Sequence, residues 1–237
     1  MKYYFYPNKA IYHVANHVLG GLGHEIVFDP SEADAYFWWK FSAEWEDFPE
    51  ELSDKPCLNR NCNCTLKTFV EDRFSLVYGR TTFVDPLTYN GLAVEKENLN
   101  ATHKCRIVEC PIKERVEGMV YQRLMSDPNN IVSYRIPVVG GEVPYVSIEH
   151  KNDMFEAVIG GGVDSFEVVD AEDLFCRDWL DKLVVFCNGY VDFAEIDVLD
   201  DCIIDVNNTA SAAPHYEPKD EDYCKSRYRE LFKKHFG

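Results

Sequence analysis

The chain has 237 residues, 46% of them hydrophobic and 14% aromatic, and 41 acidic against 24 basic side chains give a net charge of −17. This composition is typical of a folded globular protein with a sizeable core and not of a disordered chain. The acidic balance argues against general binding to nucleic acid or to an anionic membrane, because phosphate contacts are made by Lys and Arg.

In chain order, residues 1–54 predict a small α/β unit. We expect a strand at 1–6, a helix from Asn8 to about Leu19 that ends at Gly20-Gly21, and further strands at 24–29 and 35–41. Neither a secretory leader nor a run of ~18 apolar residues is visible, so we expect a cytoplasmic protein without a membrane partner.

Residues 54–65, rich in Pro, Asn and Cys, predict a linker. Nine cysteines, an odd number, in a chain without a leader indicate reduced thiols. The cluster of Cys57, Cys62 and Cys64 lacks the paired spacing of a structural zinc site, which favours a loop with buried thiols.

The remaining elements alternate between strands and helices. A helix is expected at 66–78, stopped by Gly79, and Gly140-Gly141 predicts the turn of a hairpin. The expected strands after the first helix cover residues 92–96, 105–112, 116–125, 131–139 and 142–151. Asp170 is expected to cap a helix from Ala171 to about Asn188, and a basic helix at 222–236 is expected to pack against the core.

Residues 191–208 predict a strand pair that carries five aspartates. If Asp200-Asp201 forms a two-residue turn, Ile196 lies opposite Asp205 and Ala194 opposite Asn207. Asp192, Asp205 and Asn207 then share one face, and Asp197 is excluded unless a bulge intervenes. Two carboxylates and one amide oxygen suit Mg²⁺, whereas the simpler alternative is a sheet rim that faces water.

An acid followed about a dozen residues later by IIDVN at a strand end resembles the metal motif of ATP-grasp enzymes, and DF-E-DVL…IIDVN-T resembles one branch of that superfamily. Other signatures follow in family order. Lys67 and Lys96 match the two nucleotide lysines, and Lys96 precedes the loop that covers the phosphates. Residues 120–125 resemble the adenine hinge, which implies contacts at Tyr121, Gln122 and Leu124. Arg135 and Lys151 resemble the basic pair that flanks the transferred phosphate.

Three departures from the family pattern stand out. The loop at 97–104 contains no glycine, so His103 or Lys104 would substitute in covering the phosphates. Asp205 stands where Glu is common, and the residues after Asn207 do not form a Ser-Pro-Gly turn.

The resemblance implies an α/β (α+β) ATP-grasp fold of two α/β subdomains, at 55–125 and 126–237, behind a pre-ATP-grasp-like unit at 1–54. It implies an ADP-forming carboxylate–amine ligase that uses ATP and Mg²⁺ on a small-molecule carboxylate and a nucleophile. Two alternatives stay open at this stage. A catalytically inactive nucleotide-binding module would fit the glycine-free loop, and a metal-dependent sugar-nucleotide transferase would fit the metal acids.

Overall fold

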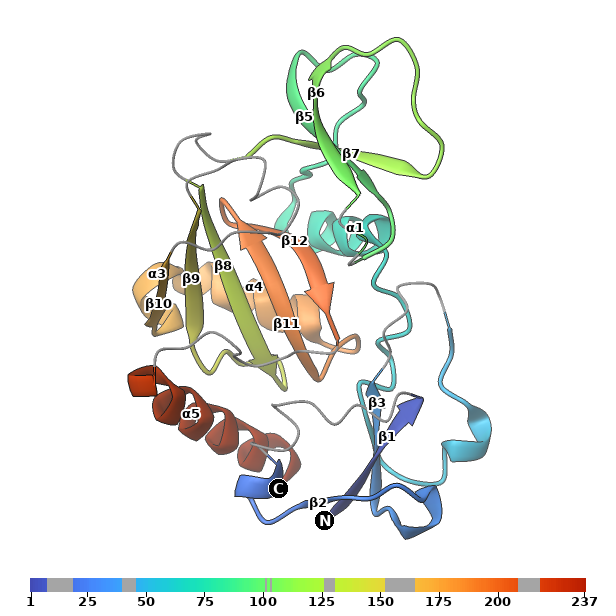
Figure 1. Cartoon of the computed structure of the whole chain (residues 1–237), viewed down its shortest axis with the longest axis vertical. Helices are drawn as coiled ribbons and strands as arrows, with labels where there is room; N and C mark the ends of the chain where they lie inside the picture. The colour runs from blue at the N-terminus through green and yellow to red at the C-terminus, as the bar shows by residue number, and fades with distance from the viewer. Residues whose placement is uncertain are drawn as a thin grey trace.

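Three β-sheets organise the part of the chain that the structure describes (Figure 1). The structure is a computed structural model, which describes residues 1–7, 19–39, 46–100, 102, 104–125, 131–151, 165–208 and 218–237. The helix expected from Asn8 lies almost wholly outside these ranges. None of the described helices is long and apolar enough to cross a membrane.

The N-terminal sheet is parallel, with the strand order β2-β1-β3-β4. Its strands are β1 (Lys2–Pro7), β2 (Glu25–Ile26), β3 (Ala35–Trp39) and β4 (Cys57–Leu58), and short 3₁₀ turns lie at Pro30–Glu32 and Glu50–Leu52. The strands expected at 1–6 and 35–41 are thus confirmed within the described residues, whereas the one expected at 24–29 has only two residues in the sheet.

The linker expected at 54–65 is wrong. Cys57–Leu58 forms the edge strand β4, which pairs with β3, and the domain boundary expected at residue 54 stays a prediction. Asn59, Cys62 and Cys64 are buried, because this segment packs between the N-terminal sheet and the rest of the molecule.

The C-terminal helix α5 (Pro218–Phe236) covers one face of the N-terminal sheet, as its expected packing role requires. Tyr228 and Phe232 of α5 lie in one core with Phe5 and Phe37, whose rings stack at 4.9 Å. Burial of each large apolar side chain of this kind contributes about 1.5–3 kcal/mol.

The middle of the chain forms helix α1 (Lys67–Tyr78) and an antiparallel sheet with the order β6-β5-β7. Its strands are β5 (Gly91–Glu97), β6 (Cys105–Cys110) and β7 (Met119–Arg123). Helix α1 ends as expected at Gly79, whose φ of 71° is a left-handed conformation that glycine adopts without strain.

The third sheet is antiparallel, with the order β10-β9-β8-β11-β12. Its strands are β8 (Ile131–Val139), β9 (Val146–Lys151), β10 (Ser165–Val169), β11 (Phe193–Leu199) and β12 (Cys202–Asn207). The hairpin expected at Gly140-Gly141 is present, and both glycines have positive φ.

The single helix expected from Ala171 to Asn188 is wrong. The chain forms α3 (Ala171–Leu174) and α4 (Arg177–Cys187), separated by Phe175 in an extended conformation. Phe175 is buried and its ring lies edge-to-face against Tyr134 of β8 at 5.4 Å, so packing on the large sheet accompanies the interruption of the helix. Asp170 makes no side-chain cap and instead accepts a hydrogen bond from Tyr223 of α5.

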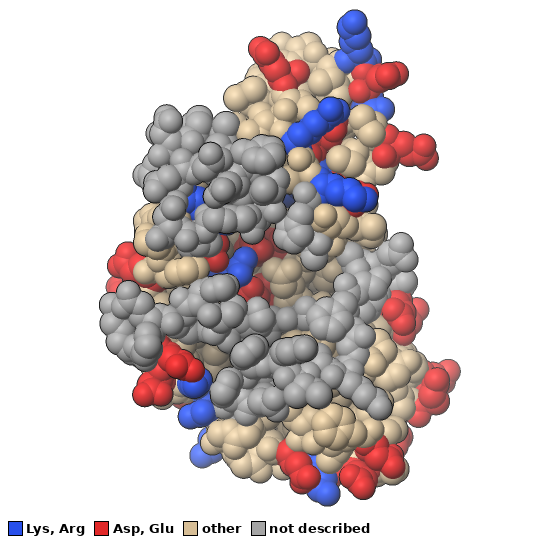
Figure 2. Space-filling model, in the orientation of Figure 1, with Lys and Arg blue, Asp and Glu red and all other residues tan. Residues whose placement is uncertain are grey.

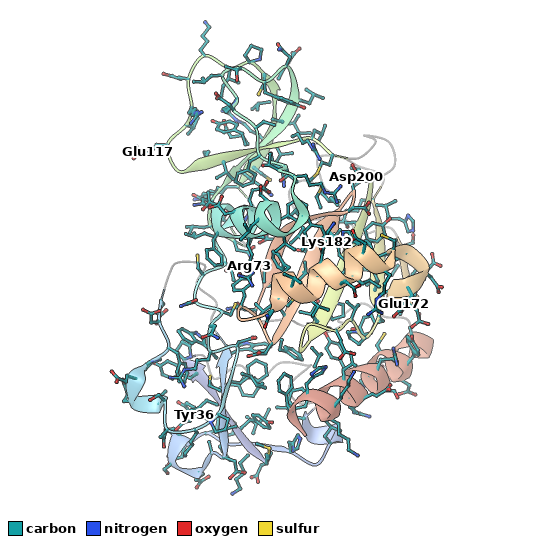
Figure 3. The ribbon with its side chains drawn as sticks, turned by 180° about the vertical axis from the view of Figure 1, so that it is seen from behind. Tyr36, Arg73, Glu117, Glu172, Lys182 and Asp200 are labelled. Atoms are coloured by element: carbon teal, nitrogen blue, oxygen red, sulfur yellow. The ribbon has the colours of Figure 1, made fainter. Side chains whose placement is uncertain are left out.

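The two faces of the five-stranded sheet have different chemistry. One face packs on α1 and α4, which lie side by side in front of the sheet when the molecule is seen from behind (Figure 3). Arg73 of α1 donates to the carbonyls of Phe186 and Asn188 at the end of α4, where the helix dipole favours a cation. Helix α1 therefore shares a core with the large sheet, and the boundary expected at 125–126 stays a prediction.

The opposite face changes character along β11. Phe193 packs against α5, whereas Glu195 and Asp197 follow at two-residue intervals on the same face. The polar end of this face lies toward the three-stranded sheet, and it holds the residues considered next.

Candidate functional site

The register of β11 and β12 differs from the expected one. At the turn, Leu199 pairs with Cys202 and Val198 with Ile203, as a two-residue turn at Asp200-Asp201 requires. Both turn residues have positive φ, which is typical of a type I′ hairpin. Beyond them the pairing shifts by one residue, so Asp197 lies opposite Asp205 and Glu195 lies opposite Asn207.

This shift is a β-bulge that leaves Ile204 without an opposite residue on β11. The expected pairing of Ile196 with Asp205 is therefore wrong, and Ile196 pairs with Val206. The bulge places Asp197 on the same sheet face as Asp205 and Asn207. The sequence alone excluded Asp197 from this face unless a bulge intervened. Asn207 Nδ2 donates to Asp197 Oδ2 over 3.2 Å.

Asp192, the third expected metal ligand, lies before β11 and is bound to Asn59. Its carboxylate accepts from the backbone N–H of Asn59 over 2.8 Å, and its own N–H donates to Asn59 Oδ1 over 2.9 Å. Burial raises the pKa of Asp192, and the bond from Asn59 partly opposes that shift. Asp192 thus joins the segment after β4 to the large sheet.

The two expected nucleotide lysines converge on Asp205. Lys67 Nζ lies 3.5 Å from Asp205 Oδ2 and donates to the carbonyl of Leu99 over 2.8 Å. Burial lowers the pKa of Lys96 to about 8, Asp205 raises it, and Lys67 lowers it further. Burial raises the pKa of Asp205 to about 6 although Lys67 and Lys96 lower it. Residues from α1, β5 and β12 therefore form one charged group.

Arg135 lies at the centre of the same sheet face. Its Nε is 3.3 Å from Asp197, 3.4 Å from Glu195 and 3.5 Å from Glu149. Burial alone would lower the pKa of Arg135, but these three carboxylates raise it well above its usual value. Arg135 therefore stays a cation and links β8 to its two neighbouring strands.

Lys151 completes the basic pair at the edge of this group. Its Nζ lies 3.4 Å from Glu149, which also accepts a hydrogen bond from Ser133. The structure therefore brings Arg135 and Lys151 to a common partner, Glu149, as neighbours on one sheet face.

Sequence reasoning missed Glu149 and Glu195. Burial raises the pKa of Glu195 to about 7, Arg135 lowers it, and Asp197 and Glu149 raise it further. The available signal was strand parity, since Glu149 precedes Lys151 by two residues and Glu195 precedes Asp197 by two. Figure 2 shows acidic and basic side chains together in a hollow on this face, below the three-stranded sheet.

The chain is similar to known proteins in its structure and not detectably in its sequence. No family model matches the chain, and no curated protein matches it. A D-alanine–D-alanine ligase from Bacillus anthracis complexed with ATP superposes with a TM-score of 0.60 at 13% identity, covering 98% of this chain and 94% of that one. The ATP-grasp ligase PsnB complexed with minimal precursor also gives 0.60 at 13% identity, covering 98% of each chain.

The chain has the ATP-grasp fold. The macrocyclase MdnC from Microcystis aeruginosa MRC, bound with precursor peptide MdnA, agrees with this, with a TM-score of 0.56 at 11% identity over 98% of this chain and 100% of that one. The fold class expected from the order of the sequence signatures is confirmed.

Within this ATP-grasp fold, the residues expected to hold adenine lie on or beside β7. The Tyr121 hydroxyl donates to Glu95 over 2.9 Å, and Gln122 Nε2 donates to Thr82 over 2.7 Å. The N–H of Leu124 donates to the carbonyl of Leu92. The side chains of Tyr121 and Gln122 therefore support the small sheet, and so does the Leu124 N–H.

The glycine-free loop carries Lys104, the remaining expected nucleotide residue. Lys104 is exposed and pairs with Glu97 over 3.1 Å across the ends of β5 and β6. His103 lies outside the described residues. Lys104 is thus placed at the loop edge, and the structure does not bring it to Asp205 as it does Lys67.

The oxygen donors of the sheet face suit a hard cation. Within the described ranges, no three His, Cys, Asp or Glu side chains surround one metal position. Asp197, Asp205 and Asn207 instead offer two carboxylates and one amide, a set that leaves coordination positions for phosphate oxygens and water, as Mg²⁺ prefers. Burial is the main cause of the raised pKa of Asp205, and a bound cation would stabilise its charged form.

Proposed function

We propose that the chain is an ATP- and Mg²⁺-dependent ligase that activates a carboxylate as an acyl phosphate and releases ADP. The observation that carries the proposal is the convergence of Lys67 and Lys96 on Asp205, which lies opposite Asp197. The ATP-grasp fold supports it, since solved structures of that fold include a D-alanine–D-alanine ligase complexed with ATP and PsnB complexed with Mg and ADP.

Asp197, Asp205 and Asn207 are the proposed Mg²⁺ ligands, with Asp197 in place of Asp192. When bound, Mg²⁺ supplies charge neutralisation at the phosphate oxygens during phosphoryl transfer. The lysines serve the nucleotide: Lys67 and Lys96 would donate to phosphate oxygens, and Lys104 would approach from the loop edge. The hinge at 121–124 would hold adenine through backbone groups other than the Leu124 N–H, which already donates to Leu92.

Arg135 and Lys151 are proposed to bind the transferred phosphoryl group and the carboxylate beside it. A substrate carboxylate oxygen forms a bond to the terminal phosphorus of ATP, and the bond to ADP breaks. An amine or another nucleophile then attacks the acyl carbon, and phosphate leaves. Arg135 suits this position because a guanidinium has five donors and remains charged, so it can bind an oxyanion while it contacts Glu195.

Glu149 and Glu195 are proposed to position the basic pair. They fix Arg135 and Lys151 by ion pairs within the sheet, so that little reorganisation is needed when substrate binds. Much of the rate acceleration would come from this positioning and from electrostatic stabilisation, without a protein nucleophile.

Thermal unfolding with and without Mg-ATP tests the proposal. Ligand at ~100 times its dissociation constant stabilises a protein by about 2.7 kcal/mol, which gives a shift of a few degrees. We expect a Mg²⁺-dependent shift in the wild type that is lost in Asp205→Asn. Asp200→Asn is the matched control, because Asp200 lies exposed at the hairpin tip (Figure 3) and Asn tolerates its positive φ.

If millimolar Mg-ATP does not shift the thermal unfolding of the folded wild type, the ligase proposal is refuted. Where the shift is present, release of ADP and phosphate on addition of carboxylate and amine mixtures separates a ligase from a nucleotide-binding module. Release of UDP or GDP from a sugar nucleotide would indicate a transferase instead.

A further inference from the structure

Asn98, in the loop after β5, binds the start of α1 through both its backbone and its side chain. The carbonyl of Asn98 accepts from the N–H of Lys67, and Asn98 Oδ1 accepts from the N–H of Thr68, both over 2.9 Å. Leu66, at the N-cap position of α1, has no side chain that could do this. Asn98 therefore caps α1 from a distant segment and fixes the start of the loop over the large sheet.

Asn100 extends the same loop to β12. Its Nδ2 donates to the carbonyl of Val206 and to Asn207 Oδ1, both over 3.1 Å. The bond to a backbone carbonyl identifies the Asn100 atom as the amide nitrogen, so the Asn207 atom beside it must be the oxygen acceptor. Asn207 Nδ2 consequently points to Asp197 Oδ2.

In this orientation the Asn207 side chain cannot bind a cation held by Asp197. An amide nitrogen donates hydrogen bonds and does not bind Mg²⁺, whereas the amide oxygen does. The oxygen of Asn207 is directed to Asn100, and its N–H is directed to the carboxylate. If the amide turned, its N–H would face the N–H of Asn100, and two donors cannot pair.

Lys67 is engaged by the same loop. Its Nζ donates to the carbonyl of Leu99 over 2.8 Å, while it lies 3.5 Å from Asp205. Three successive residues, Asn98, Leu99 and Asn100, thus contact α1, a nucleotide lysine and a metal-ligand amide. The glycine-free loop makes these contacts through side chains and carbonyls in fixed positions.

We propose that Asn100 is a latch that holds Asn207 in a non-ligating orientation, so that cation binding requires release of the loop from β12. This inference rests on the proposed metal site and adds a conformational step to it. Release of Asn100 frees the Asn207 amide to turn its oxygen toward Asp197. Movement of Leu99 with it frees Lys67 to donate to a phosphate. Cation binding and loop release are therefore coupled.

Mn²⁺ binding without nucleotide, followed by calorimetry and by the electron paramagnetic resonance signal of free Mn²⁺, tests the latch. Removing the latch in Asn100→Ala should tighten Mn²⁺ binding about fivefold, the factor that corresponds to one net hydrogen bond. Thr102→Ala is the matched control in the same loop, because the Thr102 hydroxyl bonds to Glu97 and not to β12. It should leave the affinity unchanged. Asn100→Ser, too short to reach both acceptors, repeats the test.

Hydrogen exchange gives a second readout. Mn²⁺ should accelerate amide exchange at residues 98–100 of the wild type, and should change it little in Asn100→Ala, where the loop is already released from β12. Equal or weaker Mn²⁺ binding by Asn100→Ala would overturn the latch while leaving the proposed function standing. Absence of binding that depends on Asp205 in every variant would remove the metal site itself, and the latch with it.

Discussion

Asp197 and Asp205 lie opposite each other on β11 and β12 because β12 contains one extra residue, Ile204. Without this bulge Asp205 would face Ile196, a core residue with no exposed surface. The bulge therefore gives the two strands a common acidic face. Bulges next to functional sites re-aim side chains in this way.

Replacing Asp197 by asparagine should affect nucleotide binding, whereas replacing Asp192 should affect stability. Asp197→Asn should abolish the Mg-ATP-dependent thermal shift, because it removes one of the two carboxylates proposed to bind Mg²⁺. Asp192→Asn should keep that shift and instead lower the free energy of unfolding by about 1–2 kcal/mol, since it weakens the bond from Asn59. Thermal and urea unfolding of the two variants, with and without Mg-ATP, measure both effects. Loss of nucleotide binding in Asp192→Asn alone would reverse the assignment.

Asn59 should be among the most important residues for stability. Its Oδ1 accepts from the N–H groups of Asp192 and Phe193, its Nδ2 donates to Phe193, and its side chain is fully buried. Asn59→Ala leaves these buried groups unpaired and should cost about 3 kcal/mol or more, at 1–3 kcal/mol for each.

Denaturant unfolding of Asn59→Ala measures this cost. Arg60→Ala is a suitable control, since Arg60 is the exposed next residue in the chain. A change below about 1 kcal/mol in Asn59→Ala would show that its bonds are replaced by water.

Lys67 and Lys104 should differ in their effect on nucleotide binding. Lys67→Met should weaken Mg-ATP binding by at least about tenfold, because a hydrogen bond to a charged phosphate contributes ~1.5–3 kcal/mol. Lys104→Met should change it less than about threefold, since this lysine is exposed and pairs with Glu97. Calorimetric titration with a non-hydrolysable ATP analogue compares them. Equal losses would mean that the loop edge contacts phosphate as closely as α1 does.

The contact between α5 and the β8–β9 hairpin should depend on pH. Burial raises the pKa of Glu142, but hydrogen bonds from Lys234 and His235 lower it below its ordinary value. A glutamate whose pKa is lower in the folded state stabilises the protein at pH values above its unfolded pKa of about 4.3. This contribution is lost as the pH falls through the folded pKa.

Glu142→Gln should therefore destabilise the protein at pH 7 and have a smaller effect at pH 3. The difference should stay below about 1 kcal/mol, because the pair is partly exposed and screened by solvent. Urea unfolding of wild type and variant at both pH values measures it, and an equal difference at the two pH values would contradict the ion-pair origin.

The sequence by itself determined most of the local elements and their order. The turn at Gly140-Gly141 predicted the β8–β9 hairpin, and Gly79 predicted the end of α1, because these signals act between neighbours in the chain. The order of Lys67, Lys96 and Arg135 around these elements was sufficient to predict the ATP-grasp fold.

Only the tertiary structure decided which polar side chains meet. A one-residue shift exchanges the two faces of a strand, so the bulge at Ile204 places Asp197 opposite Asp205. The partners of Asn59 and Asn100 lie more than a hundred residues away in the chain, and no local pattern specifies such pairs. Packing of Phe175 against Tyr134 of β8 likewise accompanies the division of a helix that local propensity favours.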